Sequence, residues 1–188
     1  MSTNANNDTV DVMEAPRMYA QKLAIYHPSG AGTGAALQLE PRLNRRDTDH
    51  YNCFFLELAP QKSVASQDGN GRVPASFDWA RKLTVKLDFT DICEMLAVLE
   101  GRCDKLGGQK SGLFHKNGQS STVIGLQKAE KGGYFLGLSK KSGADGAVSR
   151  VNISLSDAEA IGLRSVFQAG LFFITFHTHL FGPIPTAA

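Results

Sequence analysis

The chain has 188 residues and a mass of 20.3 kDa, which suits one domain of about 150 residues with tails. With 42% hydrophobic and 20% charged residues and a formal net charge of +2, the composition excludes a wholly disordered chain and favours no class of partner. The three cysteines form no CxxC pair, which argues against a disulfide framework or a zinc site and favours a reducing, cytoplasmic compartment.

Polar residues without periodicity fill the N-terminus, so residues 1–19 are predicted to be a disordered acidic tail. This tail has no basic start followed by an apolar core and is nearly free of Arg, so we expect neither a secretory signal nor a transit peptide. Residues 20–180 are predicted to form a single domain, and residues 181–188 a second loose end. The longest strongly apolar stretch, 169–176, is about half of a membrane span, so we expect no membrane contact.

Alternation of apolar and polar residues predicts four strands in the first half of the chain. They lie around residues 22–27, 35–40, 53–58 and 82–89. Residues 61–76 are rich in Gly, Ser and Asn and are predicted to be a flexible loop inside the domain. A helix follows over residues 91–100, where Asp91 and Glu94 form a capping pair and Gly101 ends the helix.

The second half repeats this rhythm of short strands followed by one helix. Alternating strands lie around residues 122–127, 135–141 and 150–155. Lys131-Gly132-Gly133 and residues 142–146 fit hairpin turns between them. The last helix begins with a capping box at Ser156 and Glu159 and continues to about His177. The order of four strands, helix, four strands, helix predicts an α+β fold with mostly antiparallel sheet.

The second half of the last helix, AGLFFITF, is apolar nearly all round. Such a helix cannot face water, so either it is wholly internal or a second subunit covers its outer side. In a chain of this size the second subunit is favoured.

Basic residues concentrate between Lys105 and Arg150. This segment contains eight Lys or Arg and only two Asp or Glu, so its formal net charge is +6. Phe114, Tyr134 and Phe135 are interleaved with them. Cations neutralise phosphates and flat rings accept bases, so this pattern is typical of a nucleic-acid surface. A solvated sheet face, with lysines that protect edge strands from aggregation, explains the charge equally well.

Strand alternation favours the nucleic-acid surface, because it places aromatic and basic residues together on the face opposite to the aliphatic residues. Rings exposed beside cations serve base stacking better than stability, although an oligomer contact would also explain one or two of them. The residues predicted to bind nucleic acid are Tyr26, Phe55, Lys82, Lys86, Lys110, Lys116, Lys128, Phe135, Lys140, Lys141 and Arg150.

Catalytic and cofactor motifs are weak. Gly30-Ala31-Gly32-Thr33-Gly34 lacks the following GKS or GKT of a phosphate loop. His177-Thr178-His179 lacks an acidic or cysteine partner at ligand spacing and indicates a polar helix end. His50 and His115 have no companion nucleophile or carboxylate in the sequence, and the cysteines are expected to be ordinary buried thiols. We therefore expect no enzymatic activity, no metal and no cofactor.

Two short motifs resemble those of Whirly proteins. Residues 77–82 read FDWARK, similar to the (Y/F)DW(S/A)RK segment of that family, and residues 34–42 read GAALQLEPR, similar to its strand GKAAL followed by a variable pair and EPR. With the order of strands and helices, the resemblance covers about residues 20–178. The two lysines of the family's KGKAAL correspond to Gly32 and Gly34 here, so functions served by those lysines, such as assembly beyond a tetramer, do not carry over.

The resemblance implies two four-stranded sheets with helices, four subunits joined through the helical elements, and single-stranded DNA bound along strands of different subunits. We therefore expect a non-catalytic homotetramer that binds single-stranded DNA with little base specificity in replication, recombination, repair or transfer. The acidic N-terminus favours a bacterial or mobile-element relative. The alternatives are an RNA-binding protein of the same architecture, a module whose aromatics bind another protein, and, least favoured, a small enzyme.

Overall fold

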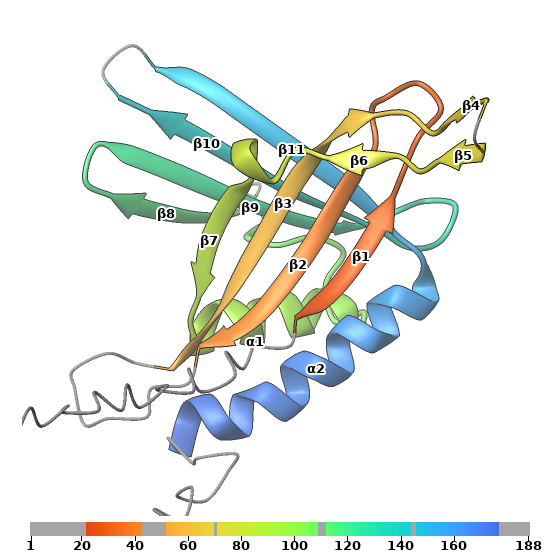
Figure 1. The fold of residues 1–188 in the computed structure, drawn as a ribbon. Helices are drawn as coiled ribbons and strands as arrows, with labels where there is room; N and C mark the ends of the chain where they lie inside the picture. Colours follow the sequence, from red (N-terminus) through yellow and green to blue (C-terminus); the bar gives the residue numbers. More distant parts are fainter. Residues whose placement is uncertain (1–21, 43–51, 70, 109–111, 144–145, 177–188) are drawn as a thin grey trace, which may run out of the picture.

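The computed structural model describes residues 22–42, 52–69, 71–108, 112–143 and 146–176. Two antiparallel sheets and two helices form the body of the molecule (Figure 1). The first sheet contains β1 (Leu23–His27), β2 (Ala35–Arg42), β3 (Cys53–Ser63) and β7 (Leu83–Leu87), paired in that order, and the short β6 (Ser76–Phe77) also pairs with β3. The second contains β8 (Leu113–Asn117), β9 (Ser120–Lys128), β10 (Tyr134–Ser142) and β11 (Ala147–Leu155), each paired with the next. The predicted α+β fold and its element order are confirmed.

The aliphatic faces of the two sheets meet to form the core. In the first sheet, one row across the strands is entirely buried and consists of Ile25, Leu37, Leu58 and Leu83. In the second sheet, Leu136 lies between Ile153 and Leu126 in register, and all three are buried. Strand β11 contacts β2 and β3 across the interface. The alternation in the sequence therefore identifies which face of each strand is inside.

The two helices pack against each other at one end of the sheets (Figure 1). Helix α1 (Phe89–Leu99) begins at Asp88, whose side chain accepts a hydrogen bond from the Asp91 amide while the Asp91 side chain accepts one from the Asp88 amide. The predicted pair, Asp91 with Glu94, was wrong by one turn, because Asp88 takes the extended conformation that ends β7 and caps the helix. Gly101 follows the helix with a φ of 73°, as predicted.

Helix α2 (Asp157–Phe176) has the predicted capping box, in which Ser156 Oγ accepts from the Glu159 amide and Glu159 Oε2 accepts from the Ser156 amide. Phe167 packs edge-on against Phe54 of β3, with ring centroids 5.9 Å apart. The predicted end at His177 lies outside the described residues. By length and composition alone α2 is sufficient to cross a membrane, a test that core helices of soluble proteins also pass.

The hairpin turns agree with the sequence. Gly132 and Gly133 join β9 to β10 with φ values of 95° and 76°, which side-chain-bearing residues rarely adopt. A Cβ on Gly133 would overlap the Leu155 carbonyl, so this turn also needs glycine for space.

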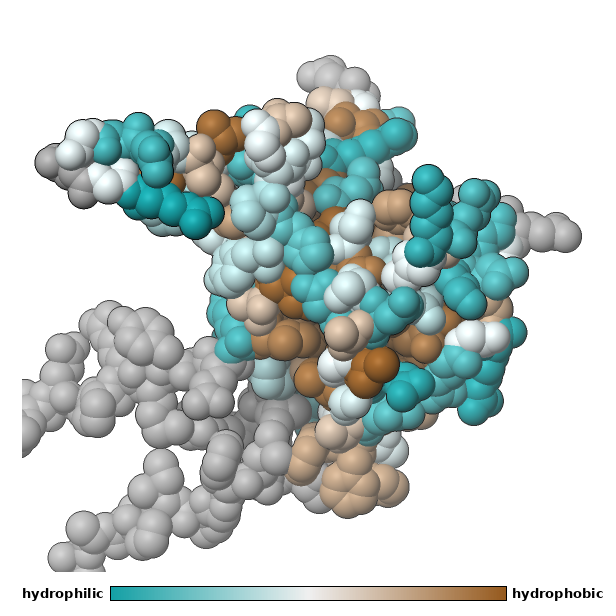
Figure 2. All heavy atoms as spheres, turned by 90° about the vertical axis from the view of Figure 1, so that its right-hand side faces the viewer, coloured by the Kyte–Doolittle hydropathy of each residue, from teal (hydrophilic) through white to brown (hydrophobic). Residues whose placement is uncertain are grey.

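Two features differ from the sequence expectations. The segment 61–76, predicted to be a loop, contains the end of β3, the hairpin of β4 (Ser66–Asp68) and β5 (Gly71–Val73), and β6 (Ser76–Phe77). All of β4 and β5 is exposed, so no apolar alternation marks these strands, and their hairpin projects from the body at the upper left of Figure 2. The second sheet also contains β8, for which alternation assigned no range. The tails predicted at 1–19 and 181–188 lie outside the described residues.

Candidate nucleic-acid interface

The second sheet has an outer face, directed away from the core, that is formed by alternate residues of its four strands. We call it the second-sheet outer face. It contains Phe114, Lys116, Ser121, Val123, Gly125, Gln127, Phe135, Gly137, Ser139, Lys141, Val148, Arg150, Asn152 and Ser154. Lys105 adjoins it, because an isolated bridge pairs Lys105 with Gln127. The register thus places Lys116, Phe135, Lys141 and Arg150, four of the residues predicted to bind nucleic acid, on one surface.

Aromatic and basic side chains occupy different rows and ends of rows across this face. Lys116 and Lys141 both pair with Ser121, so the two lysines flank one serine. Arg150 lies in the next row with Phe114 at its other end, and Phe135 lies between Ser154 and Gln127. The rings are available to a ligand, because Phe114 is 65% exposed and Phe135 47% exposed.

The second-sheet outer face is electrostatically uniform. None of its residues is Asp or Glu. Lys105, Lys116, Lys141 and Arg150 form no ion pair with any residue in the described ranges. Cations that are not neutralised within the protein attract anions, so this surface suits a chain of phosphates.

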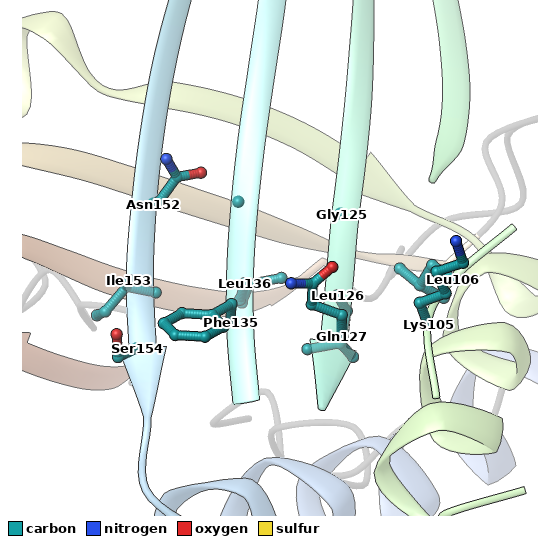
Figure 3. Close-up of a pocket in the computed structure, with 11 residues that line it drawn as sticks. Lys105, Leu106, Gly125, Leu126, Gln127, Phe135, Leu136, Asn152, Ile153 and Ser154 are labelled. Carbon is teal, nitrogen blue, oxygen red and sulfur yellow. The ribbon is translucent and has the colours of Figure 1, made fainter. Parts of the chain in front are cut away.

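A hollow of about 570 Å³ lies on this face (Figure 3). Its floor includes Gly125 and Gly137, which are direct partners in the β9–β10 register. Phe135, Gln127 and Asn152 are among the residues around these glycines. We call this feature the glycine hollow. The sequence analysis did not predict Gln127, Asn152 or Lys105 as binding residues. Strand alternation, the signal that predicted Phe135, also places Gln127 and Asn152 on the same face of the sheet as Phe135.

The outer face of the first sheet has a different electrostatic character. It carries Tyr26, Phe55, Lys82 and Lys86, as the alternation predicted. It also carries Glu40 and Glu57, of which only 6% and 7% of the accessible surface is exposed. The predicted binding residues of this sheet therefore share their surface with two buried acids.

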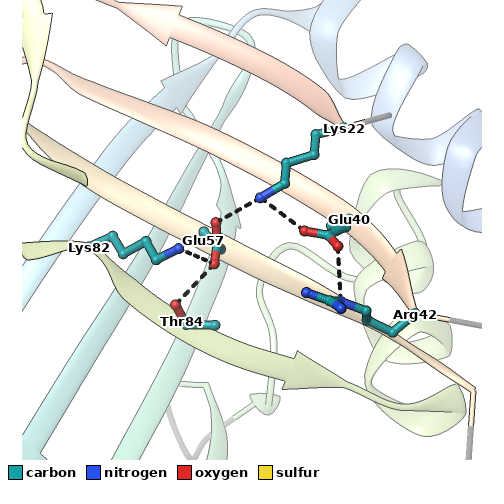
Figure 4. A network of polar contacts seen from close by, with 6 residues as sticks. All are labelled: Lys22, Glu40, Arg42, Glu57, Lys82 and Thr84. Carbon is teal, nitrogen blue, oxygen red and sulfur yellow. Dashed lines mark hydrogen bonds and ion pairs between the residues drawn. The ribbon is translucent and has the colours of Figure 1, made fainter. Parts of the chain in front are cut away.

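These acids hold most of the cations of the first-sheet outer face (Figure 4). Glu57 lies 2.6 Å from Lys82 and 3.5 Å from Lys22, and Glu40 lies 2.9 Å from both Lys22 and Arg42. Burial raises the pKa of the Glu57 carboxyl, but the hydrogen bond and charge of Lys82, together with Lys22, outweigh burial and lower it. Lys82 is thus already neutralised within the fold.

The aromatic residues of the first sheet are partly engaged as well. The Tyr26 ring packs against Phe77 at 5.6 Å between centroids, and the Arg42 guanidinium lies over Phe55 at 5.8 Å. Lys86 forms no ion pair with a described residue. This face offers a ligand fewer unpaired cations than the second-sheet outer face.

Two of the predicted lysines lie on the opposite face of the second sheet. Lys128 pairs with Tyr134, and Lys140 pairs with Thr122, so both lie at ends of the core-side face of the second sheet. Lys110 lies outside the described residues. A count of basic residues along the chain does not show on which face of a strand each residue lies. Successive side chains point to opposite faces, so an odd or even position in the strand does show it.

The other polar motifs have structural partners. The backbone amides of Ser29 and Gly34 both donate to Gln61 Oε1. These two amides, at the ends of the glycine-rich segment 30–34, are therefore hydrogen-bonded within the fold. His115 Nε2 lies 2.9 Å from Asp91 Oδ1, which gives this histidine the carboxylate companion that the sequence did not reveal.

The three free cysteines differ in their exposure to solvent. Cys53 is buried and Cys93 is partly buried, and burial raises the pKa of both thiols, but Cys103 is exposed, contrary to expectation. Its place after the C-terminus of α1, where the chain turns at the surface, explains the exposure. Among the residues described, no His, Cys, Asp and Glu cluster with metal-binding geometry occurs.

The sequence matches no protein-family model and no curated protein sequence. Solved structures with the same fold include WHY3 from Arabidopsis thaliana, with a TM-score of 0.67, 22% identity, and coverage of 87% of this chain and 92% of that one. The plant transcriptional regulator PBF-2 has a TM-score of 0.62 and 22% identity, with 82% of each chain covered. The protein therefore has a Whirly-like fold, which confirms the architecture implied by residues 34–42 and 77–82.

A guide-RNA-binding protein complex bound to its guide RNA shares this fold at a greater distance. Its TM-score is 0.53 at 18% identity, with 85% of this chain and 94% of that chain covered. The architecture thus occurs in a protein that binds RNA as well as in a transcriptional regulator.

Proposed function

We propose that the protein binds single-stranded nucleic acid through the second-sheet outer face, with little dependence on base sequence. The observation that carries the proposal is the acid-free surface that combines exposed rings with cations that form no ion pair with a described residue. Phe114 and Phe135 supply stacking surfaces, and Lys116, Lys141 and Arg150 supply phosphate contacts. The structural neighbours, which include a transcriptional regulator and a guide-RNA complex, support nucleic acid as the ligand class.

A single strand is favoured over a duplex for a physical reason. Unpaired bases are free to stack on a protein ring, whereas the bases of a duplex are already stacked on one another. The proposed ligand is single-stranded DNA, as the Whirly-like motifs imply, and RNA is the second candidate because a neighbour of this fold is bound to RNA. We also propose a homotetramer without catalytic activity, acting in the cytoplasm in DNA replication, recombination, repair or transfer.

The test is competition binding with single-stranded DNA, RNA and duplex of equal length, followed by a salt titration. We expect the single strand to compete best and log K to fall with log salt by about 0.7 for each phosphate neutralised. Lys141→Ala and Arg150→Ala should each reduce the slope. Lys128→Ala and Lys140→Ala, on the core-side face, are the matched controls and should leave it unchanged. Affinity that does not respond to salt would point to a protein partner instead.

A further inference from the structure

The glycine hollow is a gap in an otherwise continuous layer of side chains. Gly125 and Gly137 face each other across two strands, so neither strand places a side chain at this position. The adjacent rows contain Phe135 with Gln127 on one side, and Ser139 with Val123 on the other. These rows are four residues apart along each strand, which corresponds to about 13 Å. The hollow's volume of about 570 Å³ lies within the range of about 300–1,000 Å³ that is usual for small-ligand pockets.

Two side-chain amides border the gap and have no hydrogen-bond partner among the residues that the structure describes. A Cβ on Gly137 would overlap Asn152 Oδ1, so the Asn152 amide lies over the glycine and depends on the missing side chain. Figure 3 shows this amide on β11, the Gln127 amide and Gly125 on β9, and the Phe135 ring on β10. Neither amide forms a hydrogen bond with any residue that the structure describes. Each therefore has a donor and an acceptor available to a ligand.

We infer that the glycine hollow is a pocket for one unpaired nucleobase of the bound strand, an inference that rests on the proposed function. The Phe135 ring supplies the stacking surface, and the amides of Gln127 and Asn152 contact the edge of the base. Because a side-chain amide both donates and accepts, and the Watson–Crick edge of each of the four bases carries donors and acceptors, the pocket accepts all four bases. Lys105, at the rim, is positioned for the adjoining phosphate.

The decisive variant is Gly125→Val, which fills the floor of the hollow without disturbing the fold. A Cβ at this position meets no atom within 4 Å, its backbone is not in the left-handed region, and valine is favoured in strands. We expect affinity for an oligothymidine to fall about 5- to 150-fold, the equivalent of losing one stacked base. The thermal midpoint and the salt slope should remain those of the wild type.

The matched control is Ser149→Val, which places a valine at an exposed position of β11 beside Lys140, on the face opposite to the second-sheet outer face and outside the hollow. It should bind as the wild type does. An oligomer of equal length with abasic sites is the second probe. The wild type should bind it less tightly than oligothymidine, and Gly125→Val should narrow that difference, because the contribution of one base site is lost while Phe114 can still stack a base.

The outcomes separate this inference from the proposed function. If the wild type binds no single strand at all, both fail. If it binds but Gly125→Val retains wild-type affinity, the pocket is wrong and the interface stands. The pocket is also wrong if Gly125→Val weakens the abasic and the base-containing strand equally, because the valine would then obstruct the backbone path rather than a base site.

Discussion

At the scale of single residues, Glu57 shows how the fold controls charge on the first sheet. Its carboxylate is buried beside Lys82 and Lys22, and its pKa is lowered because those cations outweigh the effect of burial. A carboxyl whose pKa is lower in the folded state stabilises the fold above its unfolded pKa. That contribution declines as the pH falls below the ordinary glutamate pKa of about 4.3 and is lost as the pH passes through the lower pKa of the folded state.

The first prediction concerns Glu57→Gln, measured by urea unfolding at pH 7 and pH 3. At pH 7 the variant should lose about 1–3 kcal/mol, because the buried glutamine no longer offers Lys82 a charged acceptor. At pH 3 the difference from the wild type should shrink, since pH 3 lies below the ordinary pKa of a glutamate and the carboxyl then takes up a proton on unfolding. Glu130→Gln, at an exposed acid in the β9–β10 turn, is the control and should cost little at either pH. A difference that stays constant with pH would show that the ion pair does not stabilise the fold.

The second prediction, also at the residue scale, separates stacking from charge. Phe135→Ala should weaken single-strand binding by roughly 1–3 kcal/mol while the salt slope stays constant, because no phosphate contact is removed. Duplex binding should change less. The thermal midpoint should shift little, since the ring is exposed and pairs with Ser154 and Gln127 rather than with the core. Loss of folding with intact binding in the folded fraction would place Phe135 in the core.

At the scale of elements, α2 contains two glycines in contrasting environments. A Cβ on Gly170 would overlap the Phe54 ring of β3, whereas a Cβ on Gly162 meets no atom within 4 Å. The first glycine permits close approach of helix and sheet, and the second only lowers helix propensity. The same substitution in one helix therefore has opposite expected effects.

The third prediction follows from that contrast. Gly162→Ala should stabilise the protein by about 0.4–1 kcal/mol, because alanine reduces the entropy of the unfolded chain. Gly170→Ala should destabilise it by about 1–3 kcal/mol, because Phe54 must shift to admit the methyl group. Denaturant unfolding monitored by circular dichroism measures both. Equal effects of the two substitutions would contradict the close packing of α2 on β3.

The elements also show what sequence can and cannot predict. Local rules sufficed for α2, whose cap depends on residues three apart, and for the turn at Gly132 and Gly133. They failed for β4 and β5, whose exposed side chains carry no alternation, and for β8. The pairing of Lys82 with Glu57 was also beyond local reading, because strand register brings together residues 25 positions apart. The faces on which Phe55 and Phe135 lie were predictable, because alternate residues of a strand always share one face.

At the scale of the whole molecule, the outer side of α2 remains apolar. Phe172 and Phe176 are 55% and 63% exposed and their rings lie 5.1 Å apart, while Ile161 is exposed nearer the start of the helix. Figure 2 views the side of the molecule on which α2 lies, and apolar atoms are visible among the polar ones on this side. Exposed apolar clusters of this kind are typical of surfaces that another subunit covers.

The fourth prediction is a mass near four times 20.3 kDa by light scattering, with this aromatic cluster in the subunit interface. Phe172→Glu should dissociate the assembly, because a buried unpaired charge is costly. Since Phe172 is exposed in the single subunit, the variant should keep its circular dichroism spectrum. Ser165→Glu, at another exposed position of α2, tests how far the interface extends along the helix. A wild-type protein that is a stable monomer at micromolar concentration would exclude the tetramer.

The contacts of α2 with the first sheet have a consequence for the order of synthesis. The sheet made first depends on the helix made last: Phe54 packs on Phe167, the Asn52 amide donates to the Phe173 carbonyl, and His27 lies 2.7 Å from Glu159. When the ribosome has just completed β11, the segments of all strands have been synthesised, but Phe54 of β3 still lacks the helix that covers it. A nascent chain stalled at residue 155 should therefore expose Phe54 to chaperones, and release of α2 from the exit tunnel is the event that makes the domain stable.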